Sequence, residues 1–200
     1  MGGFTVGGVL LAAGEGRRFG APKALIEVAG ATMVERGVRL LFDGGCDEVV
    51  VVLGAAAAEV RRRVCLLPAR PLHNPRWATG RASSLRVGLG GLSPASGAAV
   101  IALVDQPLVG PDAVRRLAAA WRAGARAAVA TYSGARRNPV LLGRALWGPV
   151  TEQISGDTGA RVLLASRPGL AVDVACDGTG SPEDVDTPSD LERILRLVPR

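Results

Sequence analysis

Residues 7–16 read GGVLLAAGEG, an apolar run that passes into a turn containing Gly14 and Gly16. The run has the length of a buried strand, and the two glycines mark its end. Two further strand-like segments are Glu48–Leu53, which contains four consecutive valines, and the apolar run Ala98–Val104. Strands of a parallel sheet are buried on both faces and therefore lack alternation, so these runs predict such a sheet.

Helical patterns alternate with the strands along the chain. Thr32–Phe42 has apolar residues at helical spacing, and Pro111–Ala123 opens with a proline where a first turn accepts one. This alternation predicts a three-layer α/β/α domain, and a length of 200 residues fits one domain over residues 1–200. The other predicted strands are Gly7–Ala13, Arg126–Thr131, Pro139–Leu142 and Leu170–Ala175, and the other predicted helices are Ala55–Val64, Ser83–Leu92, Thr158–Ser166 and Ser189–Val198.

The composition excludes several classes of protein. The 24 Lys and Arg residues exceed the 18 Asp and Glu residues by six, but the chain has no dense basic stripe or aromatic set, so we expect no nucleic-acid partner. The apolar runs are too short to span a membrane, and no signal peptide is apparent, so we expect a cytoplasmic protein without a membrane partner. Three cysteines, Cys46, Cys65 and Cys176, match no zinc or redox pattern.

The loop after the first strand is the first place to look for a ligand, because ligands bind beyond the carboxyl ends of such strands. Gly14 and Gly16 let backbone N–H groups approach an anion, and Arg18 offers a planar fork of donors to phosphate. Lys23 is the single lysine beside 23 arginines, which favours a specific role for its compact ammonium group. A Gly-rich turn with solvated cations is the open alternative, since neither a Walker pattern nor a clean GxGxxG is present.

Two acidic positions suit a hard metal ion. Asp105 directly follows the strand Ala98–Val104, where a carboxylate can hold Mg²⁺ together with a substrate phosphate. Asp186 lies in the acidic run Glu183–Asp190. The alternatives are a turn aspartate before Pro107 and, for the acidic run, capping of the last helix by Ser189 and Asp190.

Ordered motifs along the chain resemble those of the MobA-like nucleotidyltransferases, closest to the molybdenum cofactor cytidylyltransferases. Residues 11–23, LAAGEGRRFGAPK, resemble the signature LAAGxSxRxGxPK, with Gly16 in place of its serine. Residues 74–85, NPRWATGRASSL, resemble NPxWxxGxxSSL. The other matches are Asp105-Gln106-Pro107 to DQP, Asp184–Asp190 to DxDTPxD, and residues 137–141 and 156–161 to GxPV and GDxGAR, so that the resemblance covers about residues 8–197.

The resemblance implies a Rossmann-like nucleotide-diphospho-sugar transferase fold and a set of site residues. Arg18, Lys23 and Asp105 would be catalytic, and Asp105 and Asp186 would hold Mg²⁺. The nucleotide would contact Leu11, Ala12, Ala13, Gly14, Gly16, Arg18, Lys23, Asn74, Gly80, Ser83, Ser84 and Asp105. The acceptor would contact Gln106, Pro107, Asn138, Pro139, Gly156, Asp157 and Arg161. From the residues alone, Ser83 and Ser84 could cap a helix, Asp157 and Thr158 could begin one, and Arg161 could pair with a carboxylate.

The implied activity is transfer of a nucleoside monophosphate from an NTP to the phosphate of a molybdopterin-type acceptor, with release of pyrophosphate. Ala12-Ala13 resembles the cytidylyl branch of the family, which favours CTP. A molybdenum hydroxylase apo-enzyme is the implied protein partner. Two alternatives stay open: an enzyme of the same fold that uses a sugar 1-phosphate or a phospholactate-like acceptor, and a non-catalytic accessory protein for molybdenum hydroxylase maturation.

Overall fold

A single seven-stranded sheet forms the centre of the part of the chain that the computed structural model describes, residues 5–167 and 169–197. Its strands are β1 (Thr5–Ala12), β4 (Glu48–Leu53), β5 (Arg70–His73), β6 (Ser96–Leu103), β7 (Ala127–Tyr132), β8 (Ala135–Gly143) and β9 (Val172–Ala175). Their order is β5-β4-β1-β6-β8-β7-β9. β8 is antiparallel to both of its neighbours, and the other pairs are parallel. The prediction of a mostly parallel sheet is therefore confirmed.

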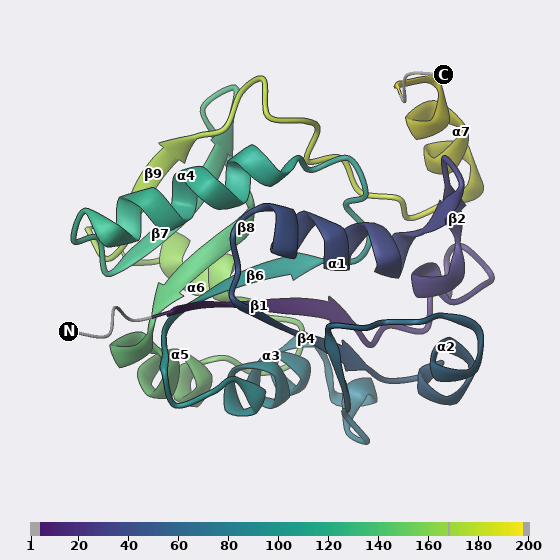
Figure 1. The fold of residues 1–200 in the computed structure, drawn as a ribbon, viewed down its shortest axis with the longest axis horizontal. Helices are drawn as coiled ribbons and strands as arrows, with labels where there is room; N and C mark the ends of the chain where they lie inside the picture. The colour runs from purple at the N-terminus through teal and green to yellow at the C-terminus, as the bar shows by residue number, and fades with distance from the viewer. Residues whose placement is uncertain (1–4, 168, 198–200) are drawn as a thin grey trace.

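Helices cover both faces of the sheet (Figure 1). α1 (Met33–Asp43) and α4 (Pro111–Arg122) pack on one face, and α3 (Arg81–Gly91), α5 (Trp147–Gln153) and α6 (Ala160–Ala165) pack on the other. α2 (Ala57–Arg63) and α7 (Pro188–Leu197) contribute Val60 and Ile194 to the core on the α1 side. This arrangement is the predicted three-layer α/β/α, Rossmann-like architecture.

Alternation along β1 and β4 explains their continuous apolar sequences. In β4, Val49 and Val51 enter the core under α1, whereas Val50 and Val52 enter the core under α3. All four valines are buried because each side of the strand faces a helical layer. The run of valines is thus a direct consequence of the three-layer packing.

Some elements differ from the sequence-based prediction. β5 was not predicted because it contains Pro71, which the outermost position of the strand permits. β8 begins four residues earlier than the predicted strand Pro139–Leu142. It pairs with β7 through a turn in which Ser133 and Gly134 both have positive φ, as the tightest hairpins require.

Helix α5 and the short hairpin of β2 (Glu27–Val28) and β3 (Ala31–Thr32) were also not predicted. Three short 3₁₀ segments, η1 (Lys23–Leu25), η2 (Trp77–Thr79) and η3 (Arg144–Leu146), complete the described elements. The predicted last helix ended at Val198, which lies outside the described residues. Among the helices described, none has the length and apolar character needed to cross a membrane.

Candidate active site

A cleft of about 1100 Å³ opens at the carboxyl ends of β1 and β6. The loop after β1, the loop after β6 and the segment before α7 all contribute to its walls. It is the position at which an open parallel sheet normally binds its ligand. The predicted site residues that line the cleft are Leu11, Ala13, Gly14, Gly16, Arg18, Lys23, Gly80, Ser84, Asp105, Gln106, Asn138, Asp157, Arg161 and Asp186.

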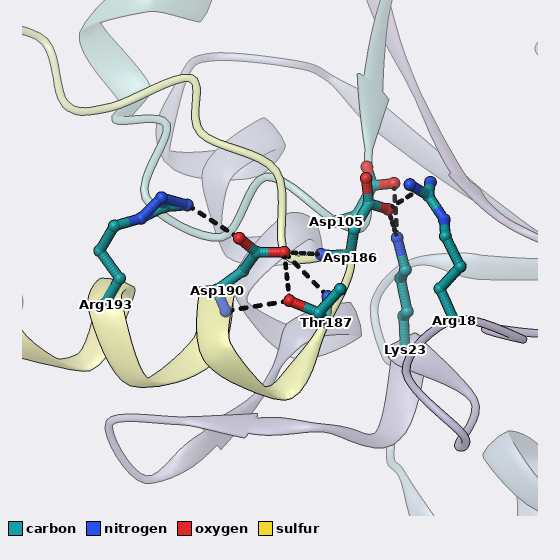
Figure 2. Close-up of polar contacts among 7 residues, drawn as sticks. All are labelled: Arg18, Lys23, Asp105, Asp186, Thr187, Asp190 and Arg193. Carbon is teal, nitrogen blue, oxygen red and sulfur yellow. Dashed lines mark hydrogen bonds and ion pairs between the residues drawn. The ribbon is translucent and has the colours of Figure 1, made fainter.

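Lys23 connects two carboxylates that are far apart in the sequence (Figure 2). Its Nζ lies 3.2 Å from Oδ2 of Asp105 and 2.5 Å from Oδ1 of Asp186. Nη2 of Arg18 lies 2.9 Å from the same Asp186 oxygen. Only 14% of the Lys23 side chain is exposed, so this charge interaction is screened less than a surface ion pair. The geometry brings together the four charged residues for which phosphate or metal contacts were predicted.

Two main-chain segments meet to create this arrangement. Asp105 follows β6, and its carbonyl oxygen accepts a hydrogen bond of 2.8 Å from the backbone N–H of Val185. An isolated antiparallel bridge also joins Val109 to Gly180. The C-terminal segment therefore lies along the loop after β6, which brings Asp186 close to Asp105.

The loop after β1 turns back on itself at Gly16. The carbonyl oxygen of Gly16 accepts hydrogen bonds of 2.9 Å from the N–H groups of Phe19 and Gly20. Gly16 has φ +74°, and a Cβ built there would lie 2.1 Å from the carbonyl oxygen of Ala21. A serine does not fit this loop conformation, which explains locally why glycine replaces the serine of the resembling signature.

The acidic side of the cleft has features that suit a metal ion. Oδ1 of Asp105 is buried and has no hydrogen-bond partner among the described residues. Although Asp184 is exposed as a residue, desolvation of its carboxyl group and the nearby charges of Asp105 and Asp186 raise its pKa. Within the described residues no group of three or more His, Cys, Asp or Glu side chains is arranged as a metal site. Two protein carboxylates with remaining ligands from phosphate and water are the usual set for Mg²⁺.

The segment around Asn74 is a buried hydrogen-bond network. Asn74, only 2% exposed, donates from Nδ2 to Oγ of Ser83 and Ser84 at 2.8 and 3.0 Å. Ser83 Oγ donates onward to the carbonyl oxygens of Arg76 and Gly80. The alternative that the serines cap a helix is excluded, because α3 begins at Arg81 with Gly80 as its N-cap. Ser84 lines the cleft, whereas Asn74, Ser83 and the buried Ala12 are not among its lining residues.

Of the residues predicted to bind the acceptor, some line the cleft and others do not. Gln106 and Asn138 are buried side chains at the cleft wall. Arg161 also lines the cleft, and its Nη1 donates a hydrogen bond of 3.3 Å to the carbonyl oxygen of Arg136. This acceptor is a main-chain carbonyl group and not the carboxylate considered from the sequence. Asp157 accepts from the backbone N–H of Arg81 at 3.3 Å and so supports the start of α3. Helix α6 begins at Ala160, later than predicted. Pro107, Pro139 and Gly156 are not among the lining residues.

The structure also reveals site features that were not singled out from the sequence. Arg81 and Tyr132 are newly found lining residues. Arg137, which departs from the glycine of the family motif, also lines the cleft, as does Trp77, which packs against Gly54 as expected of a packing anchor. Thr187, rather than Ser189, pairs with Asp190 at the start of α7. The spacing Thr-Pro-x-Asp was a readable signal, since it places a capping residue, a first-turn proline and a third-position acid in order.

Comparisons with known proteins agree with this geometry. Residues 8–172 match the model of the MobA-like NTP transferase domain. The chain is 39% identical over 198 residues to a nicotine blue oxidoreductase of Paenarthrobacter nicotinovorans, covering 95% of this chain and 96% of that protein. It is 29% identical over 190 residues to a molybdenum cofactor guanylyltransferase of Rhodobacter capsulatus, covering 94% of each.

Solved structures are similar over almost the whole chain. The crystal structure of Rv0371c from Mycobacterium tuberculosis H37Rv has a TM-score of 0.86 and 30% identity, covering 98% of this chain and 100% of that one. A complex of Rv0371c with manganese has a TM-score of 0.82 and 29% identity, covering 97% and 100%. The matched domain spans the cleft-forming loops after β1 and β6, and by this match the chain belongs to the MobA-like NTP transferase family.

Proposed function

We propose that this protein is a Mg²⁺-dependent nucleotidyltransferase that transfers CMP from CTP to the phosphate of a molybdopterin-type acceptor and releases pyrophosphate. The observation that carries the proposal is the convergence of Lys23, Arg18, Asp105 and Asp186 in one cleft. Cations for a triphosphate and carboxylates for a metal ion are the two parts that phosphoryl transfer requires. The whole chain, residues 1–200, would form one such domain.

Asp105 and Asp186 would hold the Mg²⁺. The buried, unpartnered Oδ1 of Asp105 is an oxygen donor of the kind that this hard ion prefers. When bound, the ion supplies charge neutralisation at the α-phosphate and the leaving pyrophosphate. Rv0371c was solved with manganese, a divalent ion with similar oxygen preference.

Lys23 and Arg18 would bind the triphosphate beside the backbone N–H groups of Gly14 and Gly16. An oxygen of the acceptor phosphate attacks the α-phosphorus, and the bond from that phosphorus to the bridging oxygen of the β-phosphate breaks. The electron pair leaves with pyrophosphate, and the positive charges of Lys23 and Arg18 stabilise it. No side-chain nucleophile is needed, because the acceptor phosphate is the nucleophile.

CTP is favoured by the end of β1. Ala13 lines the cleft and is 7% exposed, and its carbonyl oxygen accepts a hydrogen bond from the N–H of Ala55. In the resembling guanylyl branch a glycine occupies this position. The additional methyl group of Ala13 reduces the space for a base, which suits a pyrimidine better than a purine.

The acceptor would bind on the opposite wall. Arg81, Arg137 and Arg161 line this part of the cleft and can attract an anionic molecule. The relative from Rhodobacter capsulatus is named a molybdenum cofactor guanylyltransferase, which supports a molybdopterin-type acceptor. A molybdenum hydroxylase apo-enzyme would receive the product, and the reaction would take place in the cytoplasm.

A pyrophosphate-release assay tests the proposal. CTP, GTP, ATP and UTP are each supplied with Mg²⁺, with and without molybdenum cofactor. We expect acceptor-dependent release that is fastest with CTP. No release with any of the four nucleotides in the presence of the acceptor would refute the proposal.

A redox activity is the second candidate. The observation that favours it is 39% identity with a protein named nicotine blue oxidoreductase, over almost the full length of both chains. Against it stands the loop after β1, which lacks the clean GxGxxG of a dinucleotide fold. Oxidation of NADH or NADPH, followed by the loss of reduced-nicotinamide absorbance with nicotine blue as the acceptor, would distinguish the two candidates.

A further inference from the structure

The C-terminal segment carries Asp186 to the site from the far end of the chain. Hydrogen bonds hold this segment to the loop after β6: Ser181 N–H donates to the Leu108 carbonyl oxygen at 2.9 Å, and Gln106 Nε2 donates to the Pro182 carbonyl oxygen at 3.0 Å. The bond from Val185 N–H to Asp105 is the last of these contacts. Val185 is the residue immediately before Asp186, so none of these three hydrogen bonds involves Asp186.

Asp190 provides a hydrogen-bond contact with the main chain of Asp186 (Figure 2). Its Oδ2 accepts hydrogen bonds from the backbone N–H of Asp186 at 3.1 Å, from the backbone N–H of Thr187 at 2.9 Å and from the Thr187 hydroxyl at 2.8 Å. The backbone N–H of Asp190 donates back to Thr187 Oγ1 at 3.3 Å. One carboxylate oxygen therefore fixes the main chain on both sides of the Asp186 carbonyl group.

Arg193 holds the other oxygen of Asp190. Its Nη2 lies 3.2 Å from Asp190 Oδ1 and 3.4 Å from Oε2 of Glu183. Asp190 is thus engaged through both oxygens, and its side chain cannot turn toward solvent without breaking an ion pair. Arg193 lines the cleft, so these contacts form part of its wall.

The start of α1 provides an internal comparison. There Glu35 Oε2 accepts from the backbone N–H and the hydroxyl of Thr32, at 2.8 and 2.6 Å. These bonds stop at Thr32, the capping residue, and the residue before it is the apolar Ala31. The Asp190 network extends one residue further outward, and that residue is Asp186.

We propose that Asp190 is a positioning residue: by binding the backbone N–H of Asp186 it holds the Asp186 carboxylate opposite Asp105, within reach of Lys23 and Arg18. The inference rests on the proposed function, in which Asp186 holds the metal ion. Residues that orient metal-binding carboxylates typically affect metal affinity or activity by about 10- to 100-fold when they are removed.

The test uses the full chain and Mn²⁺ as the probe. Mn²⁺ affinity is measured by electron paramagnetic resonance, with and without CTP, for wild type, Asp190→Ala, Asp190→Asn and the matched control Glu35→Ala. We expect Asp190→Ala to weaken Mn²⁺ binding about 10- to 100-fold and to lower kcat more than it raises KM for CTP. Asp190→Asn retains an acceptor oxygen and should recover part of the loss. Glu35→Ala should lower the unfolding midpoint and leave Mn²⁺ affinity and kcat unchanged.

Each other outcome has a defined meaning. The inference would be overturned if Asp190→Ala kept the Mn²⁺ affinity and kcat of the wild type. It would also be overturned if Glu35→Ala lost as much Mn²⁺ affinity as Asp190→Ala, or if the wild type did not bind Mn²⁺. If the wild type binds Mn²⁺ but releases no pyrophosphate from any nucleotide, the proposed function fails and the Mn²⁺ comparison still decides the role of Asp190. If Asp190→Ala does not fold, Asp190→Asn and Arg193→Ala carry the test, and wild-type affinity in both would overturn it.

Discussion

The two segments that deliver the acidic residues of the cleft are built differently. Asp105 follows β6, which lies between β1 and β8 in the sheet. Residues Ala98–Val100 of β6 are completely buried. Asp186 lies in a segment held by single hydrogen bonds and by the Thr187–Asp190 pair. Packing positions the first carboxylate and polar contacts position the second, so the two should respond differently to substitution and to pH.

Asp105→Asn should have the largest effect. It removes a charge beside Lys23 while the backbone bond between Val185 and Asp105 remains available. We expect kcat for pyrophosphate release to fall roughly 100- to 1000-fold. Asp112→Asn is the matched control, since Asp112 pairs with Arg115 on the exposed face of α4. An Asp105→Asn variant with near wild-type kcat would remove the sheet-borne carboxylate from the mechanism.

Gly110→Ala should displace the C-terminal segment by a steric clash with its backbone. A Cβ at Gly110 would lie 2.1 Å from the carbonyl oxygen of Thr179, so the backbone of the segment must move. We expect a loss of about 1–3 kcal/mol in the free energy of unfolding and a lower kcat. Gly90→Ala, in an open position on α3, should instead stabilise by about 0.5–1 kcal/mol. Denaturant unfolding measures both, and equal effects would contradict the steric argument.

Ala13→Gly should change selectivity rather than overall rate, because Ala13 contributes only a methyl group to the cleft and no charged or polar side-chain atom. Removing the methyl group enlarges the cleft where the base is proposed to bind. We expect the ratio of kcat/KM for CTP to that for GTP to fall about 10-fold. An unchanged ratio would show that another part of the cleft selects the base.

The pH dependence should reveal the polar contacts. Hydrogen bonds from Thr187 lower the pKa of Asp190 from its ordinary value of 3.8, and hydrogen bonds from Thr32 lower the pKa of Glu35 from 4.5. Stability from such groups is complete above the ordinary pKa and is lost as pH falls through the lowered value. Thermal unfolding between pH 6 and pH 2, an interval that brackets ordinary carboxyl values, should therefore show a smaller acid-induced decrease in Asp190→Asn and in Glu35→Gln than in wild type. If the unfolding midpoint fell by the same amount at acid pH in all three proteins, these pKa directions would be contradicted.

Much of the fold was readable from local patterns. The runs at Glu48–Leu53 and Ala98–Val104 predicted strands because burial on both faces leaves no polar alternation. The strand at Arg70–His73 was missed because Pro71 argues against a strand except at an edge, and edge position is a property of the assembled sheet. The antiparallel direction of β8 was likewise not specified by the apolar pattern.

The sequence by itself determined that the protein has an α/β fold with a Gly-rich loop, one lysine in that loop and two acidic motifs. These are local properties, carried by residue type and spacing. Only the tertiary structure decided that Lys23 lies between Asp105 and Asp186. Contacts between segments more than 80 residues apart depend on how strands and loops pack together, and that packing has no local sequence signature.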